Sequence, residues 1–295
     1  MKKIFFLAAM LSFLAIYSCQ DDAVPENNKE ENTETSTDEG TDGGGETITY
    51  DGTETEPKIG DYYYSDGTWS DGGLRKLYAD GTMEWAEPQP QPESGKTVIA
   101  IVFHAGHHAN DASDYTNTGI GQQKCHGYAV ALQDAKNGYC QWGDYGTEVG
   151  CCPTDGGNKQ DSYSTPDIDW SGYAWTQKII SAAGGKEKLN ATEESGYPAT
   201  YYAVVDYETK VKAPTKSSGW FLPSIGQMWN VCQNSTSLFD GKTGVSGLQS
   251  DRYWSSSEFY YYSALNALHV NVYNDDVSYN RKDHRDCYVR PVLAF

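Results

Sequence analysis

The fold is decided near the C-terminus by three short stretches, GWFLPS at 219–224, YWSSSE at 253–258 and YVRPVLAF at 288–295. The second and third predict strands at Tyr253–Ser256 and Tyr288–Leu293, because aromatic and β-branched residues favour a pleated, half-buried surface. The first leads into Ser224-Ile225-Gly226-Gln227, a capping-box pattern that predicts a helix from Ser224 to about Cys232. The end of the chain is therefore expected to combine short strands with a helix.

Working outward from these stretches, short predicted elements alternate with long polar connections. The nearly continuous β-branched run KTVIAIVF at 96–103 predicts a buried strand, and Ser171–Ala183 predicts a helix that stops at Gly184-Gly185. Asp-Gly pairs between strand-forming residues predict turns within 62–69 and 78–82. Further strands are expected at Gly127–Leu132, Tyr201–Val205 and Leu268–Tyr273. We therefore predict an irregular α+β fold with short antiparallel strands, two main helices and long loops.

The three C-terminal stretches, together with GDYYYSDGTW at 60–69, resemble the C-type-lectin-like domain of the DUF1566 type, which ends Legionella collagen-like proteins. More narrowly, they resemble the variable proteins of bacterial diversity-generating retroelements. The resemblance covers roughly residues 57–295, and it implies a C-type-lectin-like binding domain with a variable segment at 253–287. The carbohydrate-contact motifs of calcium-dependent lectins are absent, so the fold alone does not imply sugar binding.

The segment from Phe259 to Cys287 has the composition of a binding surface. Tyr gives wide amphipathic contact at low entropic cost, and Ser and Asn give adaptable hydrogen bonds. In the resembling family, randomised codons exclude Glu, Gln, Met, Trp and Lys, and of these only Lys occurs here, at Lys282. The interleaved apolar residues are expected to hold the scaffold: Ala264, Ala267, Val270, Val272 and Val277. The predicted ligand contacts are Tyr260, Tyr261, Tyr262, Asn266, His269, Asn271, Tyr273, Asn274, Asp275, Tyr279, Asn280, Arg281, Asp283, His284, Arg285 and Asp286. The alternative is a polar hairpin without a ligand.

The N-terminal residues carry the pattern of an export signal. Lys2 and Lys3 precede an apolar run that is too short to span a bilayer, and Ile16-Tyr17-Ser18-Cys19 resembles the bacterial lipoprotein box. The resemblance implies a signal peptide at 1–18 and lipidation at Cys19, and the alternative is an ordinary secretory signal. Asp21-Asp22 resembles the acidic export tag of surface lipoproteins in Bacteroidetes-type bacteria, or simply begins an acidic linker. We expect an outer-membrane, surface-exposed lipoprotein that meets the membrane through its lipid anchor only.

Charge and composition describe the segment after the anchor. Residues 19–56 are strongly acidic and low in hydrophobicity, so they are expected to be a disordered tether. The formal net charge of the whole chain is −19, and such a chain repels phosphate backbones, so no nucleic-acid partner is expected. Six cysteines follow Cys19, and the sequence does not choose among their possible disulfide pairings, although Cys125, Cys140 and Cys151-Cys152 are close enough to staple one loop region.

Residues that could bind a metal ion or catalyse a reaction are concentrated around one loop. His104, His107 and His108 with Asp111, Asp114 and His126 are residue types that bind zinc, so a metal-dependent enzyme using the His104–Asp114 loop is one alternative. No GxSxG elbow, P-loop or GxGxxG is present, and the acidic clusters at 161–169 and 275–276 do not match an EF-hand. We therefore predict a non-enzymatic surface receptor or adhesin for a protein or glycan ligand, without a cofactor. A structural envelope lipoprotein without a ligand is the other alternative.

Overall fold

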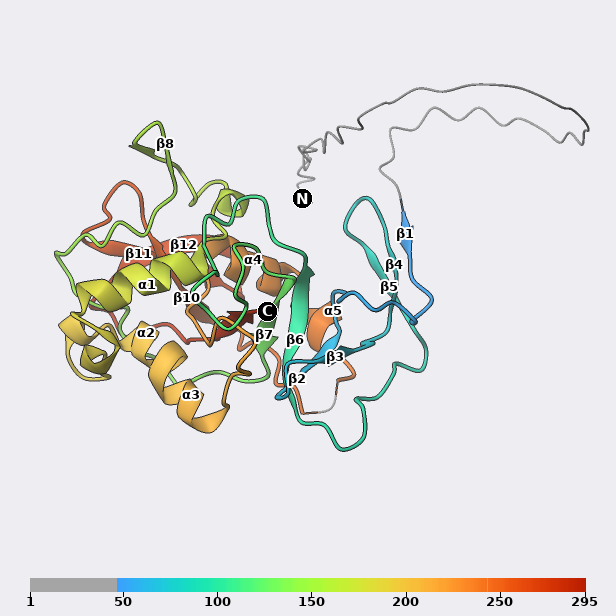
Figure 1. Cartoon of the computed structure of the whole chain (residues 1–295). Helices are drawn as coiled ribbons and strands as arrows, with labels where there is room; N and C mark the ends of the chain where they lie inside the picture. The colour runs from blue at the N-terminus through green and yellow to red at the C-terminus, as the bar shows by residue number, and fades with distance from the viewer. Residues whose placement is uncertain (1–46, 243) are drawn as a thin grey trace, which may run out of the picture. The chain divides into compact units, whose positions relative to one another are not determined.

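The computed structural model describes residues 47–242 and 244–295, and these form an α+β fold of helices and antiparallel sheets (Figure 1). The strands are β1 (Ile48–Thr49), β2 (Tyr62–Tyr64), β3 (Trp69–Ser70), β4 (Leu74–Leu77), β5 (Met83–Trp85), β6 (Val98–Ala105), β7 (Gly127–Ala131), β8 (Thr154–Asp155), β9 (Asn158–Lys159), β10 (Arg252–Glu258), β11 (Asn266–Asn271), β12 (Asp276–Arg281) and β13 (Val292–Ala294). The helical segments are η1 (Pro166–Ile168), α1 (Gly172–Ala182), η2 (Lys186–Lys188), η3 (Glu194–Gly196), α2 (Pro198–Tyr201), η4 (Tyr202–Asp206), α3 (Tyr207–Lys210), α4 (Ile225–Gln233) and α5 (Ser235–Phe239).

The largest sheet has five strands in the order β13-β7-β6-β2-β3. Its middle strand, β6, is buried on both faces: Ile101 and Phe103 pack into one hydrophobic cluster, while Ala100 and Val102 pack into another. Burial on both faces explains why residues 96–103 form an apolar run without alternation. The strands predicted at 96–103 and Gly127–Leu132 are confirmed as β6 and β7.

A second sheet has three strands in the order β10-β11-β12, and α4 packs against β10 and β11. β10 confirms the strand predicted at Tyr253–Ser256. β11 ends at Asn271 and not at Tyr273, because the Asn271 side chain accepts hydrogen bonds from the amides of Tyr273 and Asn274 and turns the chain. The strand predicted at Tyr288–Leu293 is reduced to β13 plus an isolated bridge between Tyr288 and Tyr253.

Both predicted helices are confirmed, as α1 and α4. At the start of α4, the Ser224 amide donates to Gln227 Oε1 (3.0 Å) and the Ser224 hydroxyl accepts from the Gln227 amide (3.5 Å), which completes the capping box. The strand predicted at Tyr201–Val205 is wrong, because these residues continue a helical segment that begins at Pro198. Proline suits the first helical position, and Ala203 and Val204 are buried against the core, so packing overrides the strand propensity.

The N-terminal side of the domain begins earlier than predicted. Ile48 and Thr49 form β1, whose two residues pair with Leu77 and Lys76 of β4, so residues 47–56 belong to the fold and not to a tether. The predicted hairpin turns are confirmed between β2 and β3 and between β4 and β5, where Gly67 and Gly81 adopt positive φ. The signal peptide at 1–18, the lipidated Cys19 and the tether up to residue 46 lie outside the described residues.

Two further findings concern the described residues alone. Cys125, Cys140, Cys151, Cys152, Cys232 and Cys287 are buried free thiols, so the staple considered for the loop region is absent between them. Within residues 47–242 and 244–295, no helix has the length and apolar composition that a membrane crossing requires.

Candidate ligand-binding face

A buried ion pair fixes the base of the C-terminal sheet. Lys282 Nζ lies 2.6 Å from Glu258 Oε1, and both side chains are fully buried. Glu258 also accepts the amides of Val149, Gly150 and Cys151 at 2.8–2.9 Å. Burial lowers the pKa of Lys282 even though the Glu258 carboxylate acts in the opposite direction. The pair therefore ties the end of β10, the end of β12 and the loop at 149–151 into one rigid unit.

Two serines of YWSSSE fix β10 to its neighbours, Ser257 to Asp169 before α1 and Ser255 to β11. Ser257 Oγ donates to Asp169 (2.7 Å), and Ser255 Oγ donates to the carbonyl of Leu268 (2.8 Å). Asp169 is completely buried, and burial raises the pKa of its carboxyl to about 6. We call Asp169, Ser255, Ser257, Glu258 and Lys282 the frame. Its polar contacts explain why Ser255, Ser257 and Glu258 occupy a buried strand.

An aromatic cluster begins at Phe259, directly after Glu258 of the frame. Tyr279 of β12 stacks on Phe259 with ring centroids 4.2 Å apart, and Tyr163 meets both rings edge-on at 5.6–5.8 Å. The turn after β10 adds Tyr260, Tyr261 and Tyr262, whose rings contact one another or Phe259. We call Tyr163, Phe259, Tyr260, Tyr261, Tyr262 and Tyr279 the aromatic cluster.

Exposure within the aromatic cluster is high although its base is buried. Tyr261 is 68% exposed, Tyr262 54% and Tyr279 44%, whereas Phe259 is 7% exposed. Tyr279 shares one face of the sheet with the buried Leu268 directly opposite, and it is partly exposed because β12 is an edge strand. A buried ring thus supports exposed tyrosines whose hydroxyl ends face solvent, a combination suited to recognition by contact.

The other predicted contacts are distributed over separate parts of the sheet. Tyr273, Asn274 and Asp275 are exposed at the turn between β11 and β12, and Tyr273 is 77% exposed. Asn280 and Asp286 are half-buried and hydrogen-bonded to each other on the face opposite Tyr279. Asn266 and Asn271 are half-buried at the two ends of β11, next to the turns that precede and follow this strand.

Several basic and acidic side chains lie together near the end of β12. Arg281 pairs with Asp283 at 2.6 Å and lies over the ring of Tyr145 at 4.3 Å, and cation–π contacts of this kind orient both partners. Arg281, His284 and Arg285 are exposed, and Asp283 is half-buried. Tyr145, which contacts Arg281, is not among the contacts predicted from the sequence.

The prediction is wrong for His269. Its side chain is 3% exposed and its ring meets Trp254 edge-on, with centroids 5.9 Å apart. β11 is the middle strand of its sheet, and His269 points toward the side covered by the hydrophobic core. Burial lowers the pKa of His269 to about 4, so the ring is a neutral core residue at neutral pH. Sequence reasoning also missed Tyr163, because only the tertiary fold brings this residue to β12.

The histidine loop is packed and does not converge on a common point. The rings of His104 and His108 lie against Trp170 with centroids 4.7 and 3.9 Å away, and Asp111 accepts the Tyr128 hydroxyl at 2.7 Å. Burial lowers the pKa of His104 to about 4. In the part of the chain that the structure describes, no group of three or more His, Cys, Asp or Glu side chains is placed to hold a metal ion. The metal-site alternative thus has no ligand cluster among these residues.

Comparison with known proteins bears on the fold. No protein-family model matches the chain, and no curated protein matches it. A fimbrial protein from Bacteroides ovatus ATCC 8483, known from a crystal structure, is similar over 81% of this chain with a TM-score of 0.55 and 18% sequence identity. The matched region is 49% of the fimbrial chain, so this chain spans about half of its length. At this identity the likeness is one of fold.

Proposed function

We propose that the protein is a surface-displayed lipoprotein receptor or adhesin that binds a protein or glycan ligand through the aromatic cluster. The observation that carries the proposal is the set of exposed tyrosines on a buried, polar frame. Rigid tyrosines lose little conformational entropy on binding, and fixed support avoids the cost of ordering the surface. The likeness to a fimbrial protein agrees with a surface role but extends only to the fold.

The proposed fold family is the C-type-lectin-like type, with the C-terminal segment diversified by a retroelement. Lys282 supports this idea, because the one side chain of the segment outside the expected codon set is a buried frame residue and not an exposed contact. The genomic test is direct: a near-identical copy of the codons for about 253–295 should lie beside a reverse-transcriptase gene. Without that copy, the proposal reduces to a fixed binding surface.

The binding test replaces Tyr261, Tyr262 and Tyr279 together by Ser. The matched control is Tyr78→Ser, because Tyr78 is also exposed but lies in the turn of the β4–β5 hairpin. Both proteins are applied to an array of defined glycans and to a display library of extracellular protein domains. We expect the triple variant to lose at least about thirtyfold in apparent affinity for any captured ligand, the effect of losing one hot-spot residue worth about 2 kcal/mol. Unchanged capture by the triple variant, or equal loss in the control, would contradict the assignment.

The location is tested separately from the ligand. Cys19→Ala should abolish labelling of the protein by a radiolabelled fatty acid. Protease added to intact cells should remove the domain from the surface. Retained labelling in the Cys19 variant, or complete protection from protease, would contradict the proposed anchor or the proposed surface display, respectively.

A further inference from the structure

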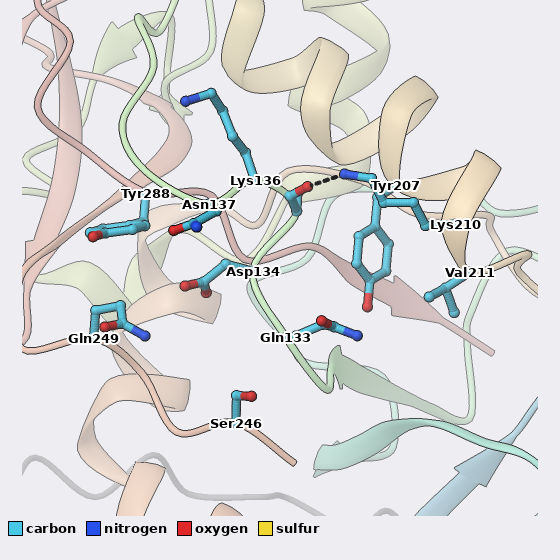
Figure 2. Close-up of a pocket in the computed structure, with 11 residues that line it drawn as sticks. Gln133, Asp134, Lys136, Asn137, Tyr207, Lys210, Val211, Ser246, Gln249 and Tyr288 are labelled. Atoms are coloured by element: carbon cyan, nitrogen blue, oxygen red, sulfur yellow. Dashed lines mark hydrogen bonds between the residues drawn. The ribbon is translucent and has the colours of Figure 1, made fainter. Parts of the chain in front are cut away.

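A pocket of about 480 Å³ is lined by residues that do not belong to the aromatic cluster. Its walls are the loop at 133–137, the end of the helical segment at Tyr207–Val211, the loop at 246–249 and the side chain of Tyr288 (Figure 2). None of the contacts predicted from the sequence lines it. Its volume falls within the range of about 300–1,000 Å³ typical of small-molecule sites.

The walls of the pocket are held by a buried arginine and a lysine. Arg290 is fully buried and donates to the carbonyls of Ala131, Ser246 and Gly247 at 3.0–3.1 Å. Lys210 Nζ donates to the carbonyl of Ala135 at 2.7 Å, the bond drawn in Figure 2. These contacts link the first loop, the helical segment and the second loop. The backbone walls of the pocket are thus fixed in advance of any ligand, which reduces the cost of binding, and only the exposed Gln133 side chain has to move.

The charged groups at the pocket are already paired within the protein. Asp134 Oδ1 lies 2.8 Å from Arg290 Nε, and Lys210 pairs with Asp206 at 2.5 Å. Lys136, the third charged group at the pocket, has no carboxylate partner among the described residues, but its Nζ donates to the carbonyl of Tyr139 at 2.8 Å and lies 5.6 Å from the ring centroid of Tyr202. An ionic ligand would have to compete with these partners, so the pocket favours a neutral one.

The groups left for a ligand are neutral. Gln133, Asn137, Ser246 and Gln249 line the pocket, and among the described residues their side chains have no hydrogen-bond partner; the bond from Gln249 to the Tyr253 hydroxyl is made by its backbone amide. Amide groups offer donors and an acceptor together, a pairing that matches the donor and acceptor character of sugar hydroxyls. The half-buried ring of Tyr288, which Tyr139 supports edge-on at 4.9 Å, adds an aromatic surface.

Tyr207 supplies an independent observation. Its side chain is 1% exposed, and its hydroxyl has no hydrogen-bond partner among the described residues. The ring enters the pocket with the hydroxyl end toward Gln133 (Figure 2). Burial raises the pKa of Tyr207 to about 12, so the hydroxyl is a neutral donor. A buried hydroxyl without a partner is unfavourable, and a ligand oxygen would satisfy it once the exposed Gln133 side chain moves aside.

We propose that this pocket binds a neutral saccharide unit, with its ring against Tyr288 and its hydroxyls bonded by Asn137, Gln249 and the Tyr207 hydroxyl. The site is separate from the aromatic cluster and would act whether or not that cluster has a ligand. Size, neutral amide lining and an aromatic surface together favour a sugar over an ion or an apolar ligand.

The test uses the full chain and the methyl glycosides of glucose, galactose, mannose and N-acetylglucosamine. Saturation-transfer NMR and calorimetry measure the affinity of wild type, Tyr207→Phe and Asn137→Ala. The matched control is Asn117→Ala, an exposed asparagine outside the pocket. At least one glycoside should bind, and each pocket variant should weaken it by about twofold to tenfold, the worth of one net hydrogen bond. The control should bind like wild type.

A second readout separates recognition from folding. Tyr207→Phe removes a hydroxyl that has no partner, so the ligand-free variant should unfold at the same temperature as wild type or higher. The proposal is overturned if none of the four glycosides binds, or if only charged sugars do. Binding that the pocket variants leave unchanged, or that the Tyr261/Tyr262/Tyr279 serine variant abolishes, overturns the placement in this pocket.

Discussion

The buried Glu258–Lys282 pair provides the sharpest test of how the candidate face is supported. Lys282→Met leaves the Glu258 carboxylate buried with three amide donors but without its counter-charge. Breaking a buried pair from one side costs about 3–5 kcal/mol of the free energy of unfolding, because an uncompensated charge remains. We expect this cost for Lys282→Met and the upper end of the range for Glu258→Gln, which leaves a buried ammonium with the carbonyl of Thr147 and the ring of Trp142 but no counter-charge.

The double variant Glu258→Gln/Lys282→Met should be far less damaging than the single variants suggest. Both charges disappear, and the glutamine carbonyl can keep two of the three amides of residues 149–151, so one amide loses its acceptor. The expected loss is about 1–3 kcal/mol, the desolvation penalty of one unsatisfied buried group. The two single losses together come to at least about 8 kcal/mol, so they should exceed the double loss by at least about 5 kcal/mol, and this excess measures the coupling of the pair.

The assay is urea unfolding followed by tryptophan fluorescence, since Trp142 lies 4.5 Å from Lys282 Nζ and is fully buried. The control is Lys178→Met, an exposed lysine that donates to the carbonyl of Gly150 in the same loop. It should cost less than about 1 kcal/mol. A Lys282→Met loss below about 1 kcal/mol, or strictly additive single losses, would refute the claim that this pair fixes the sheet.

Three further predictions concern the same core. Because the pKa of His269 falls from its ordinary value near 6.5 to about 4 in the fold, its contribution of about 3 kcal/mol is complete above pH 6.5 and is lost as the pH falls toward 4. His269→Phe should therefore reduce the loss of urea resistance between pH 7 and 4.5, and an unchanged loss would contradict the burial of this ring. Ser224→Ala should lower the free energy of unfolding by about 1–2 kcal/mol in urea titrations, because it removes the cap of α4 and the hydroxyl bonded to the Asp169 carbonyl. Cys140 and Cys287 should resist a maleimide at pH 8 until urea is added, since burial raises both thiol pKa values, and rapid labelling of the native protein would contradict this.

The fold was predictable wherever one local signal agreed with the tertiary environment. The capping box at Ser224, the doubly buried run of β6 and the Asp-Gly turns each specify their element through the backbone or through burial. Prediction failed at Tyr201–Val205, where strand-favouring residues lie in a helical segment because Ala203 and Val204 pack on the core. That outcome depends on distant partners, which a local propensity does not contain.

Residues of the candidate site were likewise predictable only where the local signal agreed with the tertiary environment. Composition identified the exposed tyrosines at 261, 262 and 279, but it treated both faces of the β11–β12 pair as one surface. His269 shows the consequence, since its polar type suggested contact while its position in a middle strand dictates burial. Tyr163 and Tyr145 were missed because they come from loops that only the folded chain brings to β12. The ion pair between Glu258 and Lys282 could not be predicted either, because no rule of sequence spacing links these two residues.

The short pairing of β1 with β4 has a mechanical consequence. A pull applied to the chain before Ile48 would load a ladder of only two residue pairs, Ile48–Leu77 and Thr49–Lys76, on an exposed strand. This ladder should open under tension before the central sheet does. After the single bonds from the Tyr50 amide to Arg75 and from Trp69 to the carbonyl of Thr55, the next resistance is Lys58, which is buried and within 3.3–3.6 Å of Glu54, Asp61 and Asp71. The strand would thus act as a release segment, which lengthens the chain under load while the sheet that carries the aromatic cluster stays folded.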